Sequence, residues 1–416
     1  MYDPVTEIQK DVLANGLEVY SIYWDRPWVK VGVVIHAASR EDLPGKTGLA
    51  HFVEHVVSEN IPHMKHSTAK QFIESTGGRS NFGVTGYLST KYGFAIPATV
   101  DLFRATIRIF GSMLIQAEIK KMVERERQVI QREFNERFPI HERLEWKMAA
   151  HRSLFKGHRF ETYSRPLGRP EDFLSITTEE LQEFYDRYYV PQNMSLIVIG
   201  GLRREQIVAE LESSPFGLEK VGERNLFPKK FTDFVAPTEQ LKKVKLSDYT
   251  KLKIDQTEYC ATWALPIDYP WEVQLIFSRI ADHILAQEVR GAAGLSYGMR
   301  TDYYFLQDAC KYWLGGMVSP KATDQINEIV RKCISMIPER KNLFQYKHRI
   351  ALKKFVMFDL SAEDLLDDIV DNIGSVRKIF THQERHDLLK AVTFDQVVDL
   401  ANFLSAERQH TLLICP

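Results

Sequence analysis

The sequence predicts two similar halves, each built from both β-strands and α-helices. Three observations predict this fold. The 416 residues are enough for two or more domains with sizeable cores. Strand-like and helical apolar patterns occur in both halves. An internal repeat appears when the sequence is shifted by 216 positions. The segments that then align without a gap are Ile176-Thr177 with Val392-Thr393, and Leu196-Ile197-Val198 with Leu412-Leu413-Ile414.

An amphipathic helix followed by an apolar strand could produce such an alignment without duplication. The threonine and following acidic residue at the start of both aligned helices favour duplication of about half the chain. A stretch rich in Lys, Glu, Pro and Ser separates the halves and predicts a linker. The predicted domains are therefore residues 1–215 and 251–416, with a linker at 216–250.

Composition predicts an ordinary globular protein, with 44% hydrophobic and 26% charged residues. The net charge of -1 gives no indication of nucleic acid or an anionic membrane as a partner. Four scattered cysteines without C-x-x-C spacing argue against a disulfide framework or a zinc ribbon. Neither an apolar leader pattern nor an 18-residue apolar run is present, so a cytoplasmic location without membrane contact is expected.

The elements of the first half follow from local patterns. Asn15-Gly16 predicts a hairpin, and the β-branched run Val29–His36 predicts a strand. A short helix ends at Gly77-Gly78, and glycine-punctuated strands cover 80–87 and 90–96. Residues 98–155 have a helical pattern. In the second half, a strand at 259–265 precedes a long amphipathic helix from about residue 271 to residue 289.

The stretch from Gly48 to Val57 carries the most informative motif. Its apolar residues recur at helical spacing and form one stripe, whereas His51, Glu54 and His55 lie three and four positions apart on another face. Two imidazoles one turn apart can bind one metal ion from the same side, and zinc is the commonest fit. A neighbouring carboxylate can accept the proton of a zinc-bound water and deliver it to a leaving group. Glu54 is the candidate.

Chance remains an alternative for this motif alone, because the chain contains 13 histidines. A helix at 119–134 adds a second observation, with Glu126 and Glu133 seven positions apart on one face, about 10 Å along the axis. A carboxylate from this helix would complete a His, His, Glu set with water in the fourth position, as in catalytic zinc sites. The corresponding place in the second half lacks the motif and instead carries Arg290, Gly294-Leu295 and Tyr297.

These stretches together resemble the pitrilysin family of zinc peptidases, the inverted zincins, which includes insulin-degrading enzyme and the mitochondrial processing peptidase. The resemblance covers essentially the whole chain, and the length resembles the short bacterial-type branch. The stretches that carry it are Asn15-Gly16-Leu17, Gly48 to His55, Gly77-Gly78, Asn81, Glu124 to Glu133, Tyr189 to Met194, and Arg290 to Tyr297.

The resemblance implies a role for each matching residue. His51, His55 and Glu133 would bind one zinc ion per chain, with Glu126 orienting a ligand and Glu54 as general base. Further substrate contacts are implied at Arg290 and Tyr297, which would reach the substrate backbone, Tyr297 also stabilising the oxyanion. The strand around Asn81 would be an open edge to which a peptide adds. This sequence has one more residue between Asn81 and Thr85 than the family's usual Asn-Ala-x-Thr.

The family also implies an α+β architecture of two similar domains, each an antiparallel sheet with helices packed on it, forming half of a clamshell. The implied activity is a zinc endopeptidase for unfolded or short polypeptides. One half-clamshell per chain predicts a homodimer in which the zinc site of one chain works with Arg290 and Tyr297 of the partner.

Two alternatives are kept: an inactive or partner-dependent subunit of a heterodimeric peptidase, and a non-catalytic scaffold. The complete His51, Glu54, His55 and Glu133 set argues against a scaffold. Because nitrogen and oxygen ligands also suit manganese and cobalt, zinc is the favoured metal and these two are substitutes.

Overall fold

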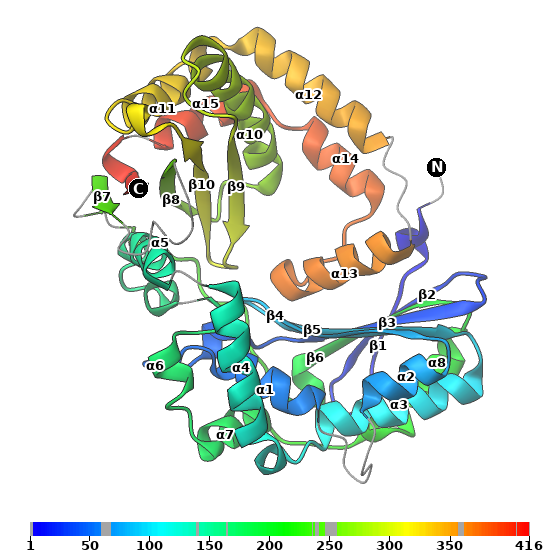
Figure 1. The fold of residues 1–416 in the computed structure, drawn as a ribbon. Coiled ribbons are helices and arrows are strands. Elements are labelled where there is room, and N and C mark those ends of the chain that lie inside the picture. The colour runs from blue at the N-terminus through cyan, green and yellow to red at the C-terminus, as the bar shows by residue number, and fades with distance from the viewer. Residues whose placement is uncertain are drawn as a thin grey trace. The chain divides into compact units, whose positions relative to one another are not determined.

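The computed structural model describes residues 3–59, 68–138, 141–163, 165–234, 236–237, 241–245, 256–356, 362–404 and 406–415 (Figure 1). The chain folds into two compact units. The first contains Met1–Arg137, Ser164–Leu226 and Asp359–His382, and the second contains Phe138–Tyr163, Phe227–Phe358 and Gln383–Pro416. None of the described helices is long and apolar enough to cross a lipid bilayer.

The first unit is built on a six-stranded sheet in the order β1-β2-β6-β3-β5-β4. Neighbouring strands are antiparallel except for β2 and β6, which run parallel. The predicted hairpin at Asn15-Gly16 joins β1 to β2, with Gly16 at a φ of 84°. The strand bounds are β1 Gln9–Val12, β2 Glu18–Tyr23, β3 Trp28–Ile35, β4 Arg79–Thr85, β5 Thr90–Pro97 and β6 Met194–Gly200.

Helices cover both faces of this sheet (Figure 1). One face carries α1, α2, α3 and α8, and the opposite face carries α13, whose Leu365, Ile369 and Ile373 pack against Val34, Ile197 and other core residues of the sheet. The helix bounds in this unit are α1 Leu49–Ser58, α2 Ala69–Ser75, α3 Val100–Ile115, α4 Val123–Arg137, α6 Pro170–Phe173, α7 Thr178–Tyr188, α8 Arg204–Glu212 and α13 Ala362–Val376.

The second unit is built on a five-stranded sheet in the order β7-β11-β8-β10-β9. Its neighbours are antiparallel except for the parallel pair β7 and β11. The strands are β7 Leu241–Lys245, β8 Thr257–Pro266, β9 Met299–Phe305, β10 Ala309–Val318 and β11 His410–Cys415. The helices are α5 His141–Leu154, α10 Trp271–Leu285, α11 Ile326–Ser335, α12 Lys341–Val356, α14 His382–Lys390 and α15 Phe394–Phe403.

The two sheets repeat one topology, which confirms the internal repeat. The order β2-β6-β3-β5-β4 corresponds strand by strand to β7-β11-β8-β10-β9, including the single parallel pair. Both α7 and α15 start with a capping box, formed by Thr177 in one unit and Thr393 in the other. The starts of α15 and β11 lie 216 positions after those of α7 and β6.

The compact units differ from the predicted boundaries of 1–215, 216–250 and 251–416. Helix α5 belongs to the second unit, where Arg143 Nε lies 2.7 Å from Glu258 Oε2. Helix α13 belongs to the first, because its apolar face completes the core of the first sheet. Part of the predicted linker, Leu241–Lys245, pairs with β11 as an edge strand. Residues 238–240 and 246–255 lie outside the described residues.

Candidate metal centre

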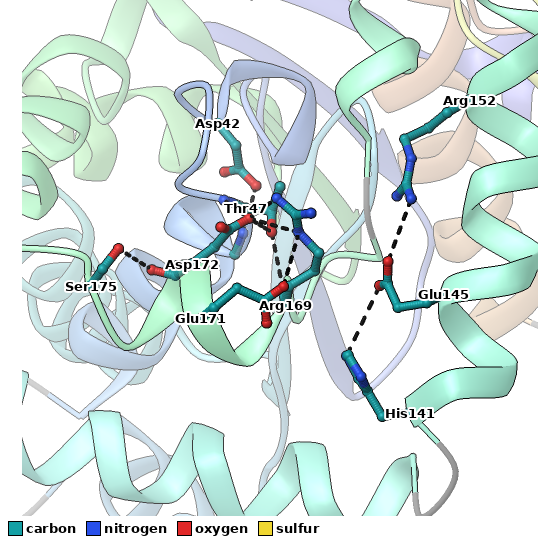
Figure 2. A network of polar contacts seen from close by, with 10 residues as sticks. Asp42, Thr47, His141, Glu145, Arg152, Arg169, Glu171, Asp172 and Ser175 are labelled. Atoms are coloured by element: carbon teal, nitrogen blue, oxygen red, sulfur yellow. Dashed lines mark hydrogen bonds and ion pairs between the residues drawn. The ribbon is translucent and has the colours of Figure 1, made fainter. Parts of the chain in front are cut away.

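The start of α1 is held in place by buried polar contacts (Figure 2). Asp42 accepts hydrogen bonds from the backbone N–H groups of Gly48 and Ala50, both at 2.8 Å, and so caps the helix. Burial nevertheless raises the pKa of Asp42 well above its ordinary value. The φ of Gly48 is 95°, and a Cβ there would lie 2.7 Å from the Leu167 carbonyl oxygen, so only glycine fits.

A second group of contacts ties this end of α1 to α6. The Thr47 hydroxyl donates to Asp172 Oδ2 at 2.6 Å, and Arg169 Nη2 lies 2.8 Å from the same oxygen (Figure 2). The Arg169 backbone N–H donates to Thr47 Oγ1 at 3.0 Å. Charge-assisted bonds of this kind are among the stronger polar contacts in proteins, so the first turn of α1 has a fixed position.

The predicted metal ligands meet between α1 and α4. His51 and His55 come from successive turns of α1, and Glu133 comes from α4. Glu133 Oε2 lies 3.3 Å from His55 Nε2 and 3.8 Å from His51 Nε2. Nitrogen and oxygen ligands of a tetrahedral zinc ion are separated by about 3.3 Å. The donor set and its spacing therefore fit a zinc ion with three protein ligands and one open position.

The protonation states of the two histidines differ because their surroundings differ. Burial, with the nearby His55 charge, lowers the pKa of His51 to about 3, so its ring is neutral. Burial also acts to lower the pKa of His55, but hydrogen bonds with the carboxylates of Glu126 and Glu133 outweigh it and raise the pKa to about 9. The carboxylates around His55 thus stabilise a positive charge on or beside its ring, and the same negative potential would attract a metal cation.

Glu126 contacts the outer nitrogen of His55, as predicted for an orienting residue. Its Oε2 lies 3.3 Å from His55 Nδ1, while the other ring nitrogen of His55 points toward Glu133. The Glu126 residue is only 2% exposed, and Arg125 Nε lies 3.5 Å from its second oxygen. A carboxylate on the far nitrogen of a ligating histidine fixes the ring orientation and makes the ring a better ligand.

Glu54, the predicted base, lies one turn after His51 and directly before His55, and it is buried, with 6% exposed. The Thr85 hydroxyl donates to Glu54 Oε2 at 2.6 Å. Gly83 covers the other oxygen, since a Cβ at Gly83 would lie 1.9 Å from Glu54 Oε1. Burial raises the pKa of Glu54. Sequence reasoning missed the roles of Thr85 and Gly83, although the motif that contains them was recognised.

The extra residue between Asn81 and Thr85 forms a β-bulge. The pairing register between β4 and β5 shifts between Asn81 and Val84, and Gly83 has a φ of 69°. Strand β4 is the last strand of its sheet, and no described strand pairs with its outer edge. The structure therefore places Asn81 on an edge strand, and its predicted contact with substrate stays a prediction.

The predicted role of Glu54 as general base makes Thr85 testable: removing its hydroxyl should slow the predicted peptide cleavage without weakening peptide binding. In a Thr85→Val variant, Glu54 keeps its space but loses the hydrogen bond that orients its carboxylate. We expect kcat to fall about 10-fold, roughly the loss of one hydrogen bond to a charged group, with KM unchanged. Thr85→Ser, which keeps the hydroxyl, should restore most of the rate. Equal losses in both variants would contradict a role for the hydroxyl.

Arg290 and Tyr297 lie in the second unit, next to each other. Arg290 belongs to a π-helical turn, Ala286–Ala292, and its guanidinium carbon lies 5.1 Å from the centre of the Tyr297 ring. Tyr297 is 86% exposed, which is unusual for a large aromatic side chain. The structure brings these two residues together, and their predicted contact with substrate stays a prediction.

Two family descriptions match consecutive parts of the chain. Residues 20–170 match the family described as Insulinase (Peptidase family M16), and residues 175–342 match the one described as Peptidase M16 inactive domain. The first match contains His51, Glu54, His55, Glu126 and Glu133.

Several curated proteins are similar in sequence. The probable zinc protease PqqL of Escherichia coli (strain K12) is 26% identical over 297 residues, covering 68% of this chain and 31% of that protein. The mitochondrial-processing peptidase subunit beta of Neurospora crassa is 29% identical, covering 55% of this chain and 48% of that protein. Cytochrome b-c1 complex subunit 1 of Mus musculus is 25% identical, covering 54% of this chain and 46% of that protein. The matches thus span a third to a half of these relatives.

Solved structures show the same fold. A protease from Helicobacter pylori superimposes with a TM-score of 0.80 over 98% of this chain and 99% of that one, at 17% identity. The periplasmic protease PqqL from Escherichia coli gives a TM-score of 0.77 over 100% of this chain and 48% of that one, also at 17% identity. At these identities the similarity concerns the fold alone, which is the α+β half-clamshell fold predicted from the sequence.

Proposed function

The chain belongs to the M16 peptidase family, and from this premise we propose that it is a zinc-dependent endopeptidase. The observation that carries the proposal is the complete site in the first unit. His51, His55 and Glu133 form a three-ligand set, and Glu54 is buried beside them. A zinc ion at this site would lower the pKa of a water molecule and polarise the scissile carbonyl group.

The protein residues would manage the proton and the orientation of the groups. The Glu54 carboxylate accepts a proton from the attacking water and passes it to the leaving amine. Thr85 and Gly83 hold the carboxylate from two sides, so little reorganisation is needed during the reaction. Glu126 keeps the His55 ring in its ligating orientation.

The edge strand β4 supports an extended peptide as substrate. Its outer edge offers backbone N–H and C=O groups, and its bulge contacts Glu54 through Gly83 and Thr85. A peptide that pairs with β4 would therefore pass beside the general base. Backbone pairing requires an extended segment and reads side chains weakly, so we infer that unfolded or short polypeptides are the substrates.

We also propose a homodimer with a composite site, in which Arg290 and Tyr297 of one chain act with the metal centre of the other. Mixing Glu54→Gln protein with Tyr297→Phe protein tests this arrangement. Each variant alone should be weakly active. A heterodimer should have about half of wild-type activity, because one of its two sites has neither change, so an equal mixture after random subunit exchange should recover about a quarter. Activity that stays at the level of the separate variants after subunit exchange would contradict a shared site.

A partner-dependent subunit is the second candidate. It is favoured by two relatives whose names describe them as subunits, of the mitochondrial processing peptidase and of the cytochrome b-c1 complex. This alternative predicts zinc binding by the purified chain without peptide cleavage. The cytoplasmic location also stays a prediction, and one structural relative is described as a periplasmic protease.

The proposal is tested by incubating the purified chain with a long unstructured peptide and identifying the products by mass spectrometry. We expect internal cuts that stop when a chelator removes the metal and resume when zinc is restored. A peptide that stays intact with the zinc-loaded chain would move the assignment to the partner-dependent subunit. Cuts that persist after removal of the metal would exclude this site as their source.

A further inference from the structure

A cavity of about 770 Å³ lies within the first unit, on the sheet face that carries α13. Residues of β3, β5 and β4 line it on one side, and Leu366, Asp367, Val370 and Asp371 of α13 line it on the other. The metal centre is attached to the other face of this sheet, through α1. The cavity is thus separate from the metal centre, although both adjoin the edge strand β4.

Small residues line the floor of the cavity. Gly32 of β3 and Gly93 of β5 are direct partners in the sheet, so two adjacent positions of the floor have no side chain. Ala95, two positions further along β5, is nearly as small. The α13 wall comes close to Gly32, where a Cβ would lie 2.6 Å from Val370 Cγ2. Gly93 and Ala95 pair with residues of β4 and line the cavity, so at these two positions the floor beside β4 carries no large side chain from β5.

The register of β4 gives its two faces different surroundings. Arg79 pairs with Ala95 and Val84 pairs with Lys91, and all four residues line the cavity. Thr85 points to the other face, where its hydroxyl reaches Glu54. Because side chains alternate along a strand, a peptide added to β4 would direct every second side chain toward the cavity and the others toward the metal centre.

The charges in the cavity favour an acidic side chain. The charged residues that line the cavity are Lys30, Arg79 and Lys91 of the strands and Asp367 and Asp371 of α13. Lys91 forms an ion pair with Asp371, and the Lys30 ammonium lies 5.5 Å from the Trp28 ring. Arg79 is exposed at the rim and forms no ion pair or hydrogen bond with any residue that the structure describes. Of the three basic residues that line the cavity, Arg79 lies on the edge strand itself and is therefore the cation placed for a carboxylate on a neighbouring strand.

We propose that this cavity is a specificity pocket for an acidic substrate side chain, with Arg79 as its selecting residue. The proposal rests on the proposed function, because it needs a peptide paired with β4. Arg79 lies four positions before Gly83, which touches the general base. At about 3.3 Å per residue, the selected side chain lies about 13 Å, or three to four residues, from the scissile bond.

Reversing the charge of Arg79 tests the pocket. A peptide with one fixed cleavage site is made with Glu, Gln or Lys at the third or fourth residue on either side of that site. At the one position whose side chain enters the cavity, the kcat/KM of wild type should be about five-fold higher for the Glu peptide than for the Lys peptide. This factor corresponds to the energy of one cross-strand charge pair. Arg79→Glu should reverse the preference, and Ala95→Leu, which fills the floor, should abolish it.

Arg108→Glu is the matched control, since Arg108 is an exposed arginine of α3, on the other side of the sheet. It should leave the Glu-to-Lys ratio of kcat/KM unchanged. Fluorescence anisotropy with the same labelled peptides measures binding separately from cleavage. Equal ratios in wild type and Arg79→Glu, in binding as well as cleavage, would overturn the pocket. Binding preferences that follow Arg79 without any cleavage would support the pocket and contradict the proposed activity.

Discussion

A Glu54→Gln variant should lose about 10²–10⁴-fold in kcat while binding zinc as tightly as wild type. The amide has the size of the carboxylate and can still meet the Thr85 hydroxyl, but it cannot accept a proton from water. Glu54 is not one of the three residues that form the metal-ligand group. The measurements are kcat on an unstructured peptide and zinc content by mass spectrometry of the metal.

Glu74→Gln is the control for this change, because Glu74 is exposed on α2. It should leave both kcat and zinc content unchanged. Retention of more than a tenth of the wild-type rate by Glu54→Gln would show that another group acts as the base. Loss of zinc from that variant would instead give Glu54 a role in metal binding.

A Glu133→Gln variant should lose zinc as well as activity. The carboxylate oxygen near both histidines becomes a neutral amide, which is a much weaker zinc ligand. Loss of a residue that only orients a metal ligand typically lowers metal affinity by up to about 100-fold. Because Glu133 is itself a predicted ligand, we expect its substitution to lower zinc affinity by more than that. Competition with a chromophoric chelator measures the affinity. The fold should remain, since Glu133 is only partly buried.

Glu124→Gln provides a matched change on the same helix. Glu124 is largely exposed, and its oxygen lies 3.6 Å from Arg127 in a surface pair, which contributes little to stability. Its zinc affinity should equal that of wild type. If Glu133→Gln also keeps wild-type affinity, the third ligand is a different residue and the assignment of α4 to the metal centre is wrong.

Features that depend on local spacing could be predicted from the sequence. The i, i+3 and i, i+4 relations that place His51, Glu54 and His55 on one helix face follow from helix geometry alone. The repeat was visible because α7 with β6 and α15 with β11 keep the same length and cap. The assignment of Glu133 to the same site as the two histidines needed the family resemblance. Spacing along one helix cannot show which residue of another helix lies against it.

Features that depend on long-range packing were missed. The apolar stripe of α13 would suit either sheet, so its sequence could not indicate that Leu365 and Ile369 pack in the first unit. The predicted antiparallel sheets are present, and each also contains one parallel pair that local patterns could not indicate, because β2 and β7 join strands far away in sequence. Similarly, the insertion before Thr85 was visible, but only the bulge with Gly83 against Glu54 explains it.

The central claim is that one zinc ion, held by His51, His55 and Glu133, enables this chain to hydrolyse peptide bonds. Titrating the metal-free chain with zinc while recording the cleavage rate of an unstructured peptide tests it most directly. We expect a rate that rises in proportion to added zinc and reaches its plateau at one ion per chain. A chain that takes up one zinc ion and leaves the peptide intact, or that cleaves equally well without zinc, would contradict it.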